Sequence, residues 1–178
     1  PSAYAFIVEE FETDSYPFNI PGKIIMHDED AVHKPTIFWC HGGPHDGTDE
    51  PFLKKLAEYL NSNVVGFDFR GSFIYGYRNV AQSPTHANIV DGRLTNFYTC
   101  VDADYGGGHM EDLKSVVQHV KQVYGHRVNS DRLVIAGHSF GGYMAALAVT
   151  DPHFSETFKL GILCSGFYNL GQYQSMNC

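Results

Sequence analysis

LVIAGHSFGGYMA, at residues 133–145, sets an apolar run before a glycine-flanked serine and a second apolar run after it. The first run has the character of a buried strand, and the pattern around Tyr143–Val149 is typical of a helix. Between them, Gly137, Ser139 and Gly141 fit G-x-S-x-G, a motif that requires a strand before it and a helix after it. The segment therefore predicts a sharp turn that exposes the hydroxyl of Ser139 as a nucleophile.

The flanking glycines have a physical reason in such a turn. A side chain at Gly137 or Gly141 would collide with the neighbouring strand or helix, and Gly142 extends the same freedom by one position. A tight strand-to-helix turn with a serine as helix cap is the alternative, and it occurs in proteins without catalytic activity. The sequence context favours the nucleophile.

A nucleophilic serine needs N–H groups that stabilise the negative charge of the tetrahedral intermediate. The N–H of Phe140 is one candidate, because it follows the serine at the start of the helix. His41-Gly42-Gly43-Pro44 comes directly after the apolar run TIFWC, and we expect Gly43 to supply the second N–H. An ordinary glycine-proline turn is the alternative for this tetrapeptide.

Strand and helix patterns alternate along most of the chain, which predicts an α/β fold with a mostly parallel, doubly wound sheet. The predicted strands are Lys23–His27, Thr36–Cys40, Val64–Asp68, Arg132–Ala136 and Lys159–Cys164, all of them apolar. Predicted helices carry Phe52, Leu53, Leu56, Ala57 and Leu60 on one face, and Met110, Leu113, Val117, Val120 and Tyr124 on another. We expect Gly125 to end the second helix in a left-handed turn. Between Val80 and Gly108 the periodicity fails, and we expect one short element at most there.

Length and composition narrow the function classes. The 178 residues predict a single domain over 1–178. A net charge of −8 disfavours binding to nucleic acid. The sequence has no apolar run near the roughly 18 residues that a membrane-spanning helix needs. The chain has no signal-peptide pattern, so we expect it in the cytoplasm. The four cysteines are scattered, which favours free thiols, with Cys40 and Cys164 buried at strand ends.

Three motifs together resemble a known family. HGGPHD at residues 41–46, DFRGS at 68–72 followed by Tyr75-Gly76-Tyr77, and GHSFGGYMA at 137–145 are similar to the catalytic domain of the prolyl oligopeptidase family, in particular its acylaminoacyl-peptidase and dipeptidyl-peptidase branches. Residues 11–26 resemble the first strands of that domain. The resemblance implies an α/β-hydrolase fold and cleavage of short or N-acylated peptides through an acyl-enzyme. It also implies that Arg70 and Tyr75 lie near the rim of the site. The sequence has no HExxH or comparable pair, and its glycine clusters lack the P-loop lysine and the dinucleotide spacing, so we expect no metal and no cofactor.

The chain departs from the family pattern in its acid and base. In α/β-hydrolases these residues follow the serine on later strands, and only residues 140–178 remain here. Asp151 and His153 are substitutes that we expect to lie too far from Ser139, beyond the helix that follows it. His138 should point away from the serine, and His41 and His45 fit loop shaping better than general base catalysis.

These departures predict an incomplete domain, truncated after the strand that follows the nucleophile turn. Without a base the serine is a weak nucleophile, so this chain alone should be inactive or nearly so. The last strand would be an exposed apolar edge, which predicts a homodimer or association with a missing C-terminal part. Two other functions stay open: a carboxylesterase or lipase of the same fold, and a hydrolase-like binding protein without activity.

Overall fold

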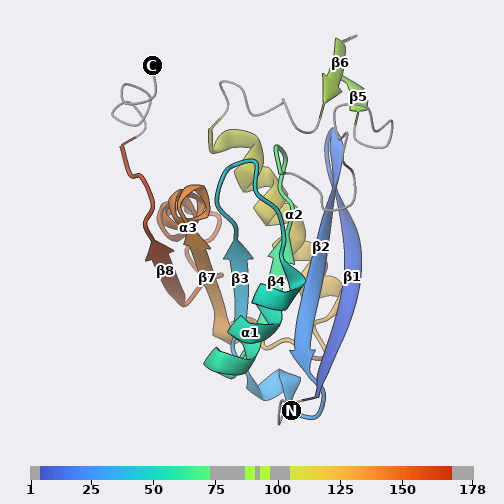
Figure 1. Ribbon diagram of the computed structural model, residues 1–178, viewed down its shortest axis with the longest axis vertical. Coiled ribbons are helices and arrows are strands. Elements are labelled where there is room, and N and C mark those ends of the chain that lie inside the picture. Colours follow the sequence, from blue (N-terminus) through green and yellow to red (C-terminus); the bar gives the residue numbers. More distant parts are fainter. Residues whose placement is uncertain (1–4, 73–86, 91–92, 97–104, 170–178) are drawn as a thin grey trace.

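A six-stranded β-sheet runs through the centre of the molecule in a computed structural model that describes residues 5–72, 87–90, 93–96 and 105–169 (Figure 1). The strand order is β1-β2-β4-β3-β7-β8. Bounds are β1 Phe6–Ser15, β2 Phe18–His27, β3 Thr36–Cys40, β4 Asn63–Phe67, β7 Leu133–His138 and β8 Leu160–Cys164. Strands β4, β3, β7 and β8 run parallel, whereas β1 and β2 pair antiparallel with their neighbours. The mostly parallel sheet agrees with the sequence prediction.

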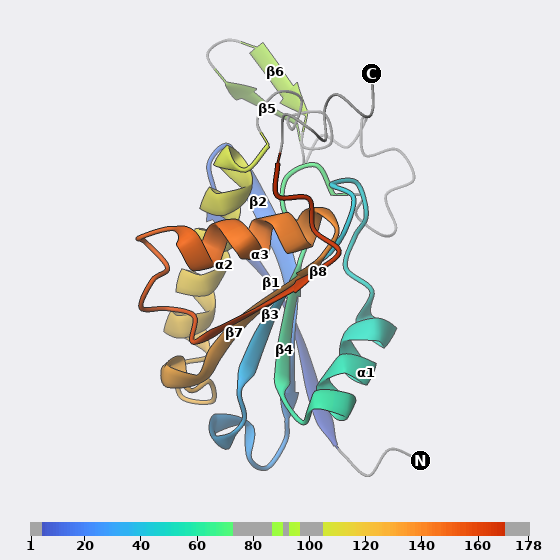
Figure 2. The ribbon, with the colours of Figure 1, turned by 90° about the vertical axis from the view of Figure 1, so that its left-hand side faces the viewer.

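Helices cover both faces of this sheet, as a doubly wound architecture requires (Figure 2). They are α1 Glu50–Leu60 on one face, and α2 Gly107–Val123 and α3 Phe140–Thr150 on the other. Two short 3₁₀ helices, η1 Ala31–His33 and η4 Ser130–Arg132, lead into β3 and β7. None of the helices in the described ranges combines the length and the hydropathy that a membrane-spanning helix needs.

The two faces bury different amounts of apolar surface. The larger core lies between the sheet and the helices α2 and α3, and it contains Phe38, Leu113 and Ile135, each fully buried or nearly so. The smaller core lies under α1 and includes Leu53 and Val64. Burial of this apolar surface is the main force that holds the layers together.

Two predictions about helices need correction. The stretch predicted to be irregular up to Gly108 ends earlier, because α2 begins at Gly107; Gly106 precedes the helix as its cap, with a positive φ of 102°. Gly125 does not adopt a left-handed conformation; α2 ends at Val123, and Tyr124 caps it with φ −106° and ψ 7°. A Cβ at Gly125 would collide with the carbonyl oxygen of Lys121, so close backbone approach explains this glycine.

The predicted apolar face of α1 is narrower than expected. Leu53 and Ala57 are buried, but Phe52 and Leu60 are 39% and 42% exposed.

The prediction of one short element at most between Val80 and Gly108 is also wrong. Strands β5 Ala87–Val90 and β6 Arg93–Asn96 form a separate antiparallel pair there.

The last strand is exposed, as the predicted truncation implies, but its cysteine is not buried as the sequence suggested. β8 lies at the edge of the described sheet, and Leu160, Ile162 and Leu163 are 55%, 37% and 38% exposed. Cys164 at its end is exposed for the same reason, whereas Cys40 is buried; both are free thiols, as predicted. Cys100 and Cys178 lie outside the described residues.

Candidate active site

Ser139 forms the sharp turn that the sequence predicts. β7 ends at His138 and α3 begins at Phe140, so the serine alone connects strand to helix. Its backbone has φ 54° and ψ −115°, a positive φ that few residues other than glycine adopt. The N–H of Ser139 donates to the carbonyl of Cys164 at 2.9 Å, and its own carbonyl accepts from the N–H of Tyr143 at 3.1 Å. Neighbouring elements thus hold the strained residue in place.

The glycines of the motif allow the backbones to approach closely. A Cβ at Gly137 would collide with the carbonyl of Gly141, and a Cβ at Gly141 would collide with the carbonyl of Cys40. At Gly142, a Cβ would lie 2.8 Å from the carbonyl oxygen of Cys164. The turn therefore packs against the ends of both β3 and β8.

The His41–Pro44 loop lies beside this turn. β3 and β7 are neighbouring parallel strands with Cys40 opposite Gly137, so the loops that follow them leave the sheet at the same end. A Cβ built at Gly42 would lie 3.5 Å from Nδ1 of His138. Gly43 has φ 114°, and any side chain there would collide with the backbone nitrogens of the residues after Pro44. The structure thus places the His41–Pro44 loop and the Ser139 turn at the same end of the sheet. The roles of Gly43 and Phe140 as oxyanion donors stay predictions.

Phe140 combines a buried ring with a backbone N–H at the helix start. The ring is fully buried and contacts the rings of Phe69 and His109 at centroid distances of 5.6 and 4.8 Å. The first N–H groups of a helix have no partner within the helix and carry its partial positive charge. The N-terminus of α3 is therefore suited to stabilise an anion next to Ser139.

Three hydrogen bonds tie the loop after β3 to the loop after β4. Nε2 of His41 lies 2.7 Å from Oγ of Ser72, and Nδ1 of His45 lies 2.7 Å from the carbonyl oxygen of Gly71. The N–H of Thr48 donates to Oδ1 of Asp68 at 2.7 Å. These contacts fit the loop-shaping interpretation of both histidines. Ser72 is a partner that the sequence alone did not single out.

Burial changes the protonation of the groups between these loops. It lowers the pKa of His41 to about 4, because the charged imidazolium loses its hydration. It raises the pKa of Asp68 to about 6 for the same reason. At neutral pH His41 is uncharged, and the Oδ1 of Asp68 lies 3.9 Å from its Nε2.

Arg70 does not lie at the rim of the site. Its side chain is buried, and its Nη2 and Nε donate to Asp112 of α2 at 2.6 and 3.0 Å. The guanidinium leaves no room for a side chain at Gly108. The expectation of a rim position is therefore wrong for Arg70, while Tyr75 lies outside the described residues.

The substitutes for the acid and base are not brought to the serine. Asp151 and His153 follow α3, whose 11 residues separate them from Ser139 by about 16 Å. Oδ1 of Asp151 accepts from the backbone N–H of His153 at 2.8 Å, an ordinary turn after a helix. His138 is exposed and faces a cavity on the α1 side of the sheet.

That cavity has a volume of about 600 Å³ and adjoins the turn. Its wall includes His138, Trp39, Phe52, Asp46 and Cys164. Trp39 and Phe52 contact each other at a centroid distance of 5.0 Å, which gives the cavity an aromatic side. The sequence does not predict this set of wall residues, because they come from the strands β3, β7 and β8, the helix α1 and the loop after β3.

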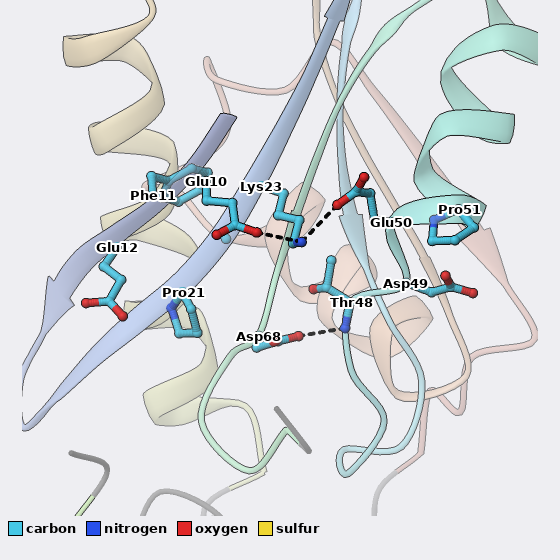
Figure 3. Close-up of a pocket in the computed structure, with 11 residues that line it drawn as sticks. Glu10, Phe11, Glu12, Pro21, Lys23, Thr48, Asp49, Glu50, Pro51 and Asp68 are labelled. Carbon is cyan, nitrogen blue, oxygen red and sulfur yellow. Dashed lines mark hydrogen bonds and ion pairs between the residues drawn. The ribbon is translucent and has the colours of Figure 1, made fainter. Parts of the chain in front are cut away.

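A second cavity, of about 710 Å³, lies between the β1–β2 hairpin and α1 (Figure 3). Lys23 crosses it and pairs with Glu10 at 2.8 Å and with Glu50 at 2.9 Å. Asp68 and Thr48 form its lower wall in the view of Figure 3. The ion pairs connect α1 to the hairpin and so support the position of the loop that precedes α1.

Comparisons with known proteins agree with this geometry. The model of the prolyl oligopeptidase family matches residues 85–177, slightly more than half of the chain. No curated protein sequence matches significantly. Among solved structures, an acylaminoacyl peptidase of Pyrococcus horikoshii aligns over 91% of this chain with a TM-score of 0.67 and 22% identity. An esterase of Pyrobaculum calidifontis aligns over 95% with a TM-score of 0.65 and 17% identity, and a puromycin-hydrolysing peptidase of Mycobacterium tuberculosis over 97% with 0.65 and 16%.

At these identities the structural likeness shows the fold. It confirms the α/β-hydrolase fold that the sequence motifs predict. The chain spans 23% of the Pyrococcus peptidase, 24% of the Mycobacterium peptidase and 47% of the esterase. It therefore corresponds to a part of each of these proteins.

Proposed function

Because the chain belongs to the prolyl oligopeptidase family, we propose that it carries the nucleophile and oxyanion hole of a serine peptidase that acts on short or N-acylated peptides. The backbone of Ser139 is the observation that supports this most directly. A non-glycine residue at φ 54° between a buried strand and a buried helix is maintained only by its surroundings. Here the surroundings are the end of β3, whose Cys40 carbonyl lies against Gly141, and the end of β8, whose Cys164 carbonyl accepts from the N–H of Ser139.

The proposed reaction begins with attack of Ser139 Oγ on the carbonyl carbon of the substrate. The carbonyl oxygen becomes an oxyanion, which accepts hydrogen bonds from the N–H groups of Gly43 and Phe140. Collapse of this intermediate breaks the peptide bond, releases the amine and leaves the acyl group on Ser139; water then releases the acid. Preorganised N–H groups lower the barrier because they need no reorientation as the charge develops.

The attack requires a base for the hydroxyl proton, and Asp151 and His153 do not reach the serine. We propose that the acid and base lie beyond residue 178 in the full-length protein, in the order that α/β-hydrolases follow. The share of the related structures that the chain spans supports this proposal. The gene sequence gives a simple check: a stop codon after Cys178 would favour a binding protein without activity.

A carboxylesterase is the second candidate, and the alignment with the Pyrobaculum esterase over 95% of this chain supports it. Both reactions use the same nucleophile and oxyanion hole, so the turn itself does not separate them. The ratio of kcat/KM for an N-acetylated peptide to that for a short-chain ester would do so. A peptidase should favour the peptide.

Labelling with a fluorophosphonate tests the proposal directly. We expect the full-length protein to form a covalent adduct at Ser139, located by mass spectrometry of the tryptic peptide. Ser139→Ala should abolish the adduct, while Ser155→Ala, in the turn after α3, should leave it unchanged. Absence of an adduct in a folded full-length protein would contradict the serine hydrolase assignment.

A further inference from the structure

The ring of His41 contacts a backbone group that belongs to the proposed oxyanion hole. Nδ1 of His41 lies 2.7 Å from the carbonyl oxygen of Gly42. A carbonyl oxygen can only accept, so the nitrogen is the donor. The Gly42 carbonyl and the Gly43 N–H belong to one peptide unit, which is planar, and in a trans unit the two groups point in opposite directions. This bond is trans, since the one cis bond in the described chain precedes Pro17.

The other side of the ring is fixed just as closely. Nε2 lies 2.7 Å from Oγ of Ser72, a residue with no exposed surface. Because Nδ1 carries the proton of the neutral ring, Nε2 accepts and the Ser72 hydroxyl donates. That hydroxyl also lies 2.6 Å from the carbonyl oxygen of Phe69, so its single proton is shared between two acceptors. The imidazole therefore has one orientation and one tautomer.

Stacking on an aromatic ring connects His41 to the nucleophile turn. The imidazole lies flat on Phe69, with a centroid distance of 4.1 Å and an interplanar angle of 16°. Phe69 in turn contacts Phe140, the residue after the serine, at 5.6 Å. The two segments proposed to supply the oxyanion donors thus share Phe69 as a common support.

From this geometry we infer that His41 is a positioning residue of the oxyanion hole: its Nδ1–H holds the Gly42 carbonyl and thereby fixes the direction of the Gly43 N–H. The inference rests on the proposed function. His41 does not contact the substrate or take the serine proton. It acts through the peptide unit between Gly42 and Gly43. Gly43 tolerates the φ of 114° that this orientation requires, because it lacks a side chain.

Two substitutions separate the two sides of the ring. His41→Asn places an amide N–H near the position of Nδ1 and keeps a donor for the Gly42 carbonyl. His41→Gln reaches the position of Nε2 and keeps a partner for Ser72, but it loses the Gly42 contact. For the full-length protein we expect kcat to fall at least about tenfold in His41→Gln, approaching the roughly 10²–10³-fold loss of a whole oxyanion donor. His41→Asn should stay within about threefold of wild type.

The kinetic pattern distinguishes positioning from general loss of structure. An interaction made only in the transition state lowers kcat and kcat/KM together, so KM should stay within about twofold. Thermal midpoints of the two variants should agree with each other. His153→Gln, an exposed histidine after α3, is the control for the exchange itself. Equal rates for the Asn and Gln variants, or a Gln variant as active as wild type, would overturn the inference while leaving the proposed function intact.

Ser72→Ala covers the case in which the His41 variants do not fold. It leaves the imidazole present but frees its Nε2, so we expect a smaller fall in kcat, of about three- to tenfold, again at constant KM. An unchanged kcat would count against the positioning role. A wild-type protein that is neither labelled nor active would overturn the proposed function, and this inference with it.

Discussion

Asp112 is the acceptor of a buried network that sequence analysis did not foresee. Its carboxylate accepts from Nε and Nη2 of Arg70, from the backbone N–H of Arg70 at 2.8 Å and from the hydroxyl of Ser15 at 2.7 Å. The side chain of Asp112 has no exposed surface. The network joins β1, the end of β4 and α2, three elements that are far apart in the sequence.

Removing the charge of Asp112 should therefore destabilise the protein strongly. In Asp112→Asn the guanidinium of Arg70 loses the carboxylate that accepts from its Nε and Nη2, and removing one partner of a buried ion pair typically costs about 3–5 kcal/mol of unfolding free energy. Urea unfolding followed by circular dichroism measures the difference. Lys114→Ala, which breaks an exposed contact with Glu111 on the same helix, should change stability by less than about 1 kcal/mol. Equal stabilities for the two variants would show that the network contributes little.

Arg70 and Ser139 illustrate which residues a sequence can place. Ser139 is determined locally, because its glycines and its flanking strand and helix lie within a few positions. Arg70 belongs to DFRGS, a motif that resembles part of an active site, yet its side chain turns inward to a partner 42 residues away. A local sequence pattern does not contain such long-range pairings. The motif therefore suggested that Arg70 lies at the rim of the site, whereas its ion pair with Asp112 holds the side chain inside the protein.

The same reasoning applies to strands and helices. The buried parallel strands β3, β4 and β7 were predicted because each is an unbroken apolar run. β1 was not predicted from periodicity, since its FIVEEFETDS sequence is rich in glutamate. It lies at the outer edge of the sheet, and among the described strands it pairs only with β2, so charged side chains remain in solvent and protect the edge from further pairing. Only the family resemblance pointed to strands in this region.

Helix α1 should depend on one side chain for its attachment to the sheet. Leu53 is fully buried, and its methyl groups occupy the space in which a Cβ at Gly66 of β4 would lie. Leu53→Ala should lower the unfolding free energy by about 2–5 kcal/mol, because it leaves a cavity between helix and strand. Tyr59→Ala on the same helix, where the side chain is 88% exposed, should change it by no more than about 0.5 kcal/mol. Chemical denaturation of both variants provides the comparison, and a Leu53→Ala variant as stable as Tyr59→Ala would contradict this account of the helix.

The shape of the whole molecule places an apolar strand at one side. In the strand order, β8 has a neighbour only on the β7 side, and α3 covers one of its faces (Figures 1 and 2). Leu160 and Ile162 share the face toward α1, since they pair with Val134 and Ala136 of β7. Their exposure leaves both apolar side chains and main-chain hydrogen-bonding groups available at the edge of the described sheet.

We therefore expect the 178-residue chain to associate with itself through β8 at concentrations of tens of micromolar. Pairing of two edge strands would satisfy main-chain donors and acceptors and bury Leu160 and Ile162 at the same time, and both gains favour association. Ile162→Lys places a charge at the centre of this strand and should give a monomer. Tyr59→Lys introduces the same charge at an exposed aromatic residue of α1 and should leave association unchanged. Multi-angle light scattering across a concentration series measures both. A monomeric wild-type chain, or equal dissociation by the two lysines, would show that β8 is not the contact, and the strand would then have to be protected by another part of the protein.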